Sequence, residues 1–143
     1  MAITSAVCNS FKQEILEAEH NFTASTGDTF NLALYDSDAT LNKSTTAYTT
    51  SEELATTGGY TAKGKALTSV TPVLDSDTAV CDFANTSWTS ASFTARGCLI
   101  FNDDNSDTSV CAIDFGGDKT VTSGTFTVEF PAAAASTAII AIA

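Results

Sequence analysis

The sequence predicts an all-β protein, a single antiparallel β-sandwich domain with a short N-terminal helix. Its 143 residues suit one domain over residues 1–143, with the N-terminal arm and helix in residues 1–20. Only 16% of the residues are charged, whereas Thr and Ser recur along the chain, as expected for pleated, half-exposed strands. Phe126, Val128 and Phe130 alternate with polar residues, which is the period-two pattern of a strand with one buried face.

The C-terminal half carries the clearest strand pattern. Apolar, β-branched and aromatic runs at 93–102, 109–115 and 124–130 are separated by turns rich in Gly, Asn and Asp at 103–107 and 116–118. This pattern predicts an antiparallel meander at the centre of the domain. Seven large apolar residues are expected to share one core: Phe93, Leu99, Phe101, Ile113, Phe126, Val128 and Phe130.

The N-terminal half predicts one helix, one strand and a long excursion. Asn9 or Ser10 would cap an amphipathic helix over residues 11–18. The first clear strand is expected at residues 30–35. Residues 36–64 are rich in Thr and short of large apolar side chains, which predicts a long excursion over the surface.

Further strands are expected in the middle and at the end of the chain. Residues 65–74 and 78–83 predict two strands joined by a hairpin at 75–77, with Pro72 marking an edge or a bulge. The final run, residues 138–142, is apolar on both faces. Such a strand is either central in a sheet or covered by another subunit.

Charge and hydropathy exclude several functional classes. Seventeen acidic against six basic residues give a formal charge of −11, which repels phosphates and argues against nucleic acid binding. No apolar segment approaches the ~20 residues of a membrane span, and no signal peptide is visible. We therefore expect a protein made and folded in a cytoplasm, with neither nucleic acid nor membrane as partner.

The four cysteines, Cys8, Cys81, Cys98 and Cys111, form no CxxC pair, which argues against a zinc site. Buried, reduced thiols are the expected state for a protein folded in a cytoplasm. A disulfide between Cys98 and Cys111, on neighbouring predicted strands, is the alternative.

Two sequence motifs suggest ligands but lack essential parts. Residues 59–65 match the spacing of a phosphate-binding loop, yet Ala66 stands where a magnesium-binding hydroxyl is required. Asp103, Asp107 and Asp114 are spaced as in a calcium loop, but the required glycine and the flanking helices are missing. We therefore predict no metal and no cofactor.

Catalytic candidates are equally sparse. His20 is the single histidine, so a nucleophile–histidine arrangement has one possible base. No sequence context marks a Ser or a Cys as the nucleophile, and the carboxylates cluster in turns. The sequence predicts no catalytic residues and no enzyme.

Several stretches together resemble a group of small structural proteins from tailed bacteriophages. They are residues 9–12, 32–35, 60–67, 88–97, 114–116 and 124–131. The resemblance covers nearly the whole chain and implies a virion protein that is made in the host cytoplasm. It supplies no catalytic residues and does not determine the position within the particle.

Three functions are compatible with these features. The first is a capsid decoration (cement) protein, bound to the major capsid protein outside the shell in many copies. The second is a tail, adaptor or fibre-associated protein. The third is a carbohydrate-binding module, which requires Trp88, Tyr48 and Tyr60 to be exposed.

Assembly is expected to use the apolar ends of the chain. One sandwich of this size has limited interior for both an apolar helix and an apolar C-terminal run, so at least one should pack against a neighbouring subunit. A homotrimer would bury this surface and present several copies to the virion at once. The predicted interface residues are Phe11, Ile15, Leu16, Ile139, Ile140 and Ile142.

Overall fold

The computed structural model describes residues 2–143, so Met1, the first residue of the predicted N-terminal arm, lies outside it. Within these residues the chain forms one short helix and two antiparallel sheets, which confirms the predicted all-β, sandwich-like fold. The elements in chain order are β1 (Ala6–Val7), α1 (Asn9–Leu16), β2 (Phe30–Tyr35), β3 (Lys65–Ala66), β4 (Ser69–Asp75), β5 (Thr78–Phe83), β6 (Thr86–Asn102), β7 (Thr108–Val128) and β8 (Ile140–Ile142).

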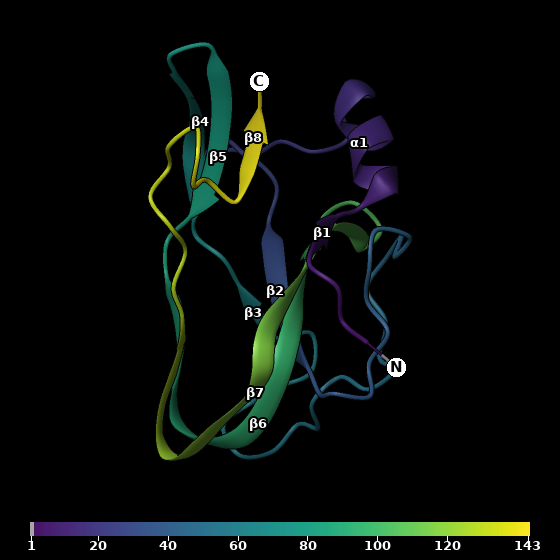
Figure 1. Cartoon of the computed structure of the whole chain (residues 1–143), viewed down its shortest axis with the longest axis vertical. Helices are drawn as coiled ribbons and strands as arrows, with labels where there is room; N and C mark the ends of the chain where they lie inside the picture. The colour runs from purple at the N-terminus through teal and green to yellow at the C-terminus, as the bar shows by residue number, and fades with distance from the viewer. Residues whose placement is uncertain (1) are drawn as a thin grey trace.

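The larger sheet has the strand order β1-β7-β6-β2-β3, and the smaller sheet has the order β4-β5-β8. Figure 1 shows the smaller sheet and α1 at one end of the molecule. The long β6–β7 hairpin runs from there to the other end, bends, and returns. The two halves of the bent hairpin therefore face each other and enclose most of the interior.

The meander predicted for the C-terminal half is instead this single bent hairpin, so the turn predicted at residues 116–118 is wrong. Gly97 pairs with Asp114 and Ala95 pairs with Lys119, which leaves residues 115–118 opposite Arg96 alone. The Gly-rich segment is therefore a bulge, with Gly116 at φ 78°. A bulge bends a strand without ending it, and β7 continues to Val128.

The prediction of one shared core is also wrong, because the larger sheet is buried on both faces. Cys98 and Ile100 of β6 point into the main core between the sheets. Leu99 and Phe101 point to the opposite face, into a second cluster with Tyr35 and others. The other five predicted core residues, Phe93, Ile113, Phe126, Val128 and Phe130, belong to or pack against the main core.

The second cluster exists because the excursion and the N-terminal arm cover that face of the sheet. Ala39 and Leu41, from the segment 36–64, are buried there together with Ile3 of the arm. Ile3 forms a parallel bridge with Leu41. A segment without large apolar runs thus completes a core that the strands alone would leave open.

The middle of the chain follows the prediction in part. Strands β2 and β5 have the expected bounds, and β4 ends at Asp75 just before β5 begins at Thr78. The single strand predicted over residues 65–74 is wrong, because Lys65–Ala66 forms β3 in the larger sheet and Ser69–Asp75 forms β4 in the smaller sheet. The register shifts between Val70 and Val73, on either side of Pro72, which confirms the expected bulge.

The helix start differs from the prediction, and one of the two alternatives for the C-terminal run, a central strand, is excluded. Helix α1 begins at Asn9, and Cys8 takes the N-cap position without a side-chain hydrogen bond, so neither Asn9 nor Ser10 is the cap. Backbone bonds hold this helix start, since Cys8 N donates to Val110 O and Asn9 N to Lys43 O. Strand β8 is at the edge of its sheet and not central.

All four cysteines are free and buried. Cys98 pairs across the hairpin with Ile113, and Cys111 pairs with Ile100, so the two thiols are not directly opposite each other. The predicted alternative, a Cys98–Cys111 disulfide, is therefore not formed.

The second cluster should carry a large share of the stability. Leu99 is fully buried there, so we expect Leu99→Ala to lower the free energy of unfolding by about 2–5 kcal/mol. Leu99→Met, which conserves side-chain volume, should cost less than about 1.5 kcal/mol. Urea unfolding of both variants measures this difference. Equal stability of the Ala variant and the parent would place Leu99 outside the core.

Candidate assembly interface

Exposed aliphatic side chains gather on three elements at one end of the molecule. Leu16 at the end of α1 is 88% exposed, Leu74 on β4 is 75% exposed and Ile142 on β8 is 55% exposed. Val70 and Val73 of β4 are also exposed. We call these five residues the apolar end. Exposed patches on monomers rarely exceed roughly 300–600 Å², and larger ones mark interaction sites.

The register explains why Leu74 and Ile142 lie together. Ala79 of β5 pairs with Leu74 on one side and with Ile142 on the other. Residues paired across antiparallel strands share a face, so the three form one row. Two residues along, the pair Cys81–Ile140 lies on the same face and is buried in the main core. The row formed by Leu74, Ala79 and Ile142 is thus an exposed continuation of the sheet face that is buried at Cys81 and Ile140.

A cleft of about 130 Å³ separates α1 from the smaller sheet beside this row. Phe11 and Ile15 of α1 line one wall, and Pro72, Ile140 and Ile142 line the other. Figure 1 shows α1 and β8 at the same end of the molecule. The structure therefore brings both apolar ends of the chain to one place.

The six predicted interface residues have different surroundings. Phe11 and Ile140 are buried in the chain's own main core, and Ile15 and Ile139 are half-buried against it. Only Leu16 and Ile142 are largely exposed. The four buried or half-buried residues shape the cleft, and the two exposed ones are available to a neighbour.

Sequence reasoning missed the contribution of β4. Residues 70–74 of this strand are exposed, including three large aliphatic side chains. The signal was present, because Val73 and Leu74 are consecutive and must point to opposite faces of a strand. Burying both requires cover on both faces, and the described residues of this chain do not supply it.

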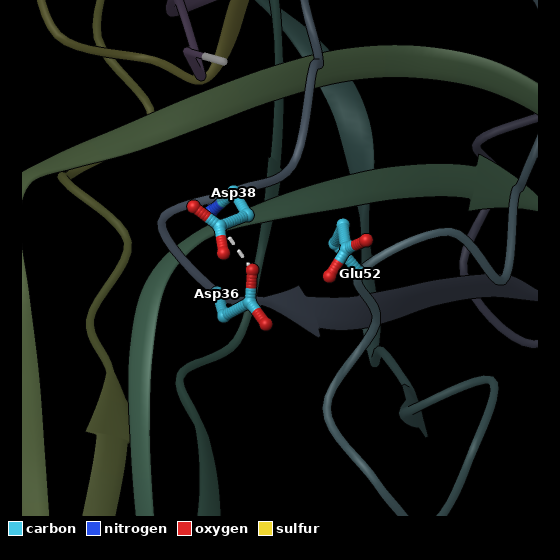
Figure 2. Close-up of side chains that lie close together, drawn as sticks. All are labelled: Asp36, Asp38 and Glu52. Carbon is cyan, nitrogen blue, oxygen red and sulfur yellow. Dashed lines mark hydrogen bonds between the residues drawn. The ribbon is translucent and has the colours of Figure 1, made fainter.

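Three carboxylates meet beyond the end of β2. Oxygen atoms of Asp36, Asp38 and Glu52 lie within 4.8 Å of one another, and this is the one such group of three metal-capable side chains found in residues 2–143. Figure 2 shows the Asp38 N–H donating to Asp36 Oδ1, a 2.9 Å bond. Asp36 is half-buried, while the others are exposed. A local turn at Asp36 accounts for the position of Asp38, and the backbone bond from Asp36 N to Glu52 O brings Glu52 alongside.

The predicted calcium-like loop is occupied by a lysine. Lys63 Nζ lies 3.1 Å from Asp103 and 2.9 Å from Asp107, so its ammonium group takes the central place between the carboxylates. Asp114 lies elsewhere and pairs with Arg96 at 2.9 Å. The phosphate-loop motif is likewise a turn that leads into strand β3 rather than into a helix.

His20 is buried and held from both sides. Its Nε2 lies 2.6 Å from Glu14 Oε2, and its Nδ1 lies 3.1 Å from Asn102 Nδ2. The Asn102 amide also donates to Asp28 and accepts from Asp104 N, which determines its orientation. Nδ1 is therefore an acceptor and Nε2–H donates to Glu14. Both ring nitrogens are engaged in joining α1 to the sheet.

The thiols are equally unsuited to nucleophilic chemistry. Burial raises the pKa of Cys81 and of Cys111 to about 12, and it also raises the pKa of Cys8 and Cys98. All four remain protonated at neutral pH, whereas the thiolate is the reactive form.

The aromatic residues required for a carbohydrate platform are not exposed together. Trp88 and Tyr60 are buried, and Tyr48 is partly buried. Both tyrosine hydroxyls donate to the Glu53 carboxylate, and Glu53 also accepts from Lys63 N. These side chains anchor the excursion, so they do not form the exposed aromatic surface that a carbohydrate-binding module requires.

Within residues 2–143, no helix has the length and apolar character needed to cross a membrane. No family model, curated protein or solved structure matches the chain.

Stability should fall as pH rises from about 9 to 12. Burial, and then the Glu53 carboxylate, raises the pKa of Tyr48 to about 12, and burial raises that of Cys81 from 9.0 to about 12. A group with a higher pKa in the folded state stabilises below its unfolded pKa, and this contribution is lost as pH rises through the folded value. Urea unfolding across this range measures the loss.

Tyr48→Phe provides the control, because it keeps the ring and removes one titrating group. Its free energy of unfolding should decline less steeply between pH 10 and 12 than that of the parent. Parallel curves would contradict the role assigned to the Tyr48 hydroxyl.

Removing divalent cations should leave thermal unfolding unchanged. Lys63 already neutralises Asp103 and Asp107, and the turn at Asp36 accounts for the second acidic group. Melting with and without a chelator tests this expectation. If the chelator lowers the melting temperature by several degrees, Asp36→Asn and Asp103→Asn will identify which group binds the cation.

Proposed function

We propose that the chain is a structural component of a bacteriophage virion, a capsid decoration (cement) protein that binds the outside of the shell in many copies. The observation that carries this proposal is the apolar end. It combines side chains from α1, β4 and β8 that a protein acting alone would have no reason to expose.

The apolar end suits contact with further copies of the chain. A net charge of −11 opposes loose association, so a stable contact requires an apolar patch large enough to outweigh the repulsion. Stable interfaces bury about 800 Å² on each partner. The cleft beside Ile142 and the protruding Leu74 offer a recess and a projection on one surface. A closed ring of three copies would bury both and multiply weak contacts to the shell.

Two further features support a structural role. Both nitrogens of the single histidine are bound in a buried network, and the thiols are buried and protonated. The acidic, Thr-rich surface favours solubility at high copy number. The resemblance of residues 60–67 and 88–97 to small phage proteins supports assembly on a virion. The partners are then other copies of the chain and the major capsid protein.

Copy number in purified particles tests the position in the virion. Quantified band intensities that correspond to hundreds of copies support capsid decoration. A ring-sized number of copies supports the alternative, a tail, adaptor or fibre-associated protein. If the protein does not occur in purified particles, the proposal is wrong.

Charged substitutions at the apolar end should dissociate the oligomer. We expect Leu74→Lys and Leu16→Lys, tested separately, to convert a trimer into a monomer, because each places a charge in a buried contact. Light scattering coupled to size-exclusion chromatography measures the mass. Thr89→Lys is the matched control, since it adds the same charge at an exposed position on β6. The interface is assigned incorrectly if both Lys variants keep the parent mass.

A further inference from the structure

Strand β7 has a long open edge. One edge pairs with β6 as far as Val128. The other edge bridges Ala47 at Thr108 and pairs with β1 at Cys111 and Ala112, and within residues 2–143 no strand pairs with it beyond Ala112. Backbone N–H and C=O groups from residue 113 to 128 on this edge therefore have no neighbouring strand. Natural proteins usually shorten, cover or interrupt such edges.

An apolar groove lies beside this edge. The bend of β7 places its two halves face to face, and the space between them has a volume of about 540 Å³. This volume is within the range of roughly 300–1,000 Å³ that is typical of ligand sites. Its apolar lining comes from Ile113, Phe115, Val121, Phe126, Phe130 and Ile139.

The groove has an aromatic floor that reaches the core. The Phe126 ring lies 6.2 Å from Phe115, 5.1 Å from Phe93 and 6.2 Å from Trp88, measured between ring centroids. Trp88 is buried, while Phe115 and Phe126 are half-buried. The main core is thus closed on the β6 side of the hairpin and open on the β7 side.

The combination of groove and edge specifies the shape of the occupant. A small apolar molecule would cover the phenyl rings but leave the backbone groups of β7 unpaired. An extended peptide supplies backbone hydrogen bonds to the edge and apolar side chains, at every second position, to the groove. The run from Gly124 to Val128 has regular pairing with β6 at Phe126, Thr127 and Val128, so its outer edge is straight enough for pairing.

Charge specifies the source of the strand. The chain carries 17 acidic and six basic residues, and Lys63 and Arg96 already pair with carboxylates. The groove's own charged lining residues, Lys119 and Glu129, are of opposite sign, so the net charge of −11 on the whole chain is what opposes pairing of two copies along this edge. A neutral or basic segment of a different protein is complementary.

We propose that the β7 edge and its groove bind an extended, neutral or basic strand of a partner protein, with apolar residues at alternate positions. The proposal rests on the proposed function only in that another virion protein would carry the strand. The pairing itself is independent of the particle. Strand addition would complete the open side of the core and attach the chain to its partner.

Synthetic nine-residue peptides test the pairing. The probe alternates Val with Thr and Lys, and its binding is followed by the fluorescence of Trp88, the single tryptophan, and by calorimetry. We expect saturable binding at or below millimolar peptide. A version with Glu in place of Lys should bind at least about tenfold more weakly.

Backbone methylation distinguishes strand pairing from apolar adsorption. Two further peptides carry N-methyl groups on one or the other alternate set of residues. Only one set of N–H groups faces the β7 edge, so one methylated peptide should lose binding and the other should keep it. Equal binding by both would overturn the proposal.

A charge inside the groove should block the peptide. Val121 is half-buried in the groove, whereas its neighbour Thr122 is exposed and does not line the groove. We expect Val121→Lys to weaken binding at least about tenfold and Thr122→Lys to leave it unchanged. Circular dichroism tests whether both variants fold. If Val121→Lys does not fold, Phe115→Lys replaces it as the groove variant.

Other outcomes would also overturn the proposal. No binding at millimolar peptide, or equal affinity for the acidic version, excludes a basic strand as the occupant. A dimer that Val121→Lys dissociates would identify the groove as a contact between copies. Particle copy number is measured separately, so the groove proposal and the virion proposal can fail independently.

Discussion

The bend of the β6–β7 hairpin is the constraint on which the rest of the structure depends. A straight strand of 17 residues, the length of β6, would extend about 55 Å at ~3.3 Å per residue, too far for a domain of this size. The hairpin folds back between Phe115 and Phe126, whose rings lie 6.2 Å apart, where its register shifts between Trp88 and Phe93. Arg96 spans the separate bulge at residues 115–118 by binding Asp114 and approaching Asp118. Gly97 is required beside that bulge, because a Cβ there would lie 2.5 Å from Ile113 O. Each half of the bent hairpin then forms one wall of the main core.

The second face of the larger sheet depends on polar anchors rather than on apolar runs. Glu53 accepts bonds from two tyrosine hydroxyls, and one of these, Tyr60, also accepts from Leu34 N in β2. Lys63 joins the excursion to the β6–β7 turn through Asp103 and Asp107. These bonds hold a Thr-rich segment against Leu99 and its neighbours. Because buried polar groups are costly when unpaired, these hydrogen bonds also restrict residues 36–64 to one arrangement.

The same architecture leaves two apolar surfaces uncovered. The smaller sheet extends past α1, so the row through Leu74 and Ile142 continues the core face into solvent. The bent hairpin encloses the core on the β6 side but leaves the groove beside Phe126 open along β7. Both surfaces are incomplete parts of a core, which suits a protein that finishes its folding by assembly. The proposed role in a virion requires two contacts of this kind, one between copies and one to the particle.

The sequence by itself determined the all-β class, the bounds of β2 and β5, the bulge at Pro72 and the inward face of Phe126, Val128 and Phe130. Each follows from alternation or turn chemistry within a few residues, which local physics controls. Only the tertiary structure decided that residues 116–118 form a bulge and that β8 is at an edge. It also decided which apolar residues stay exposed. A Gly-rich segment can reverse or bend a strand, and an apolar residue can be covered or not, according to contacts with distant parts of the chain.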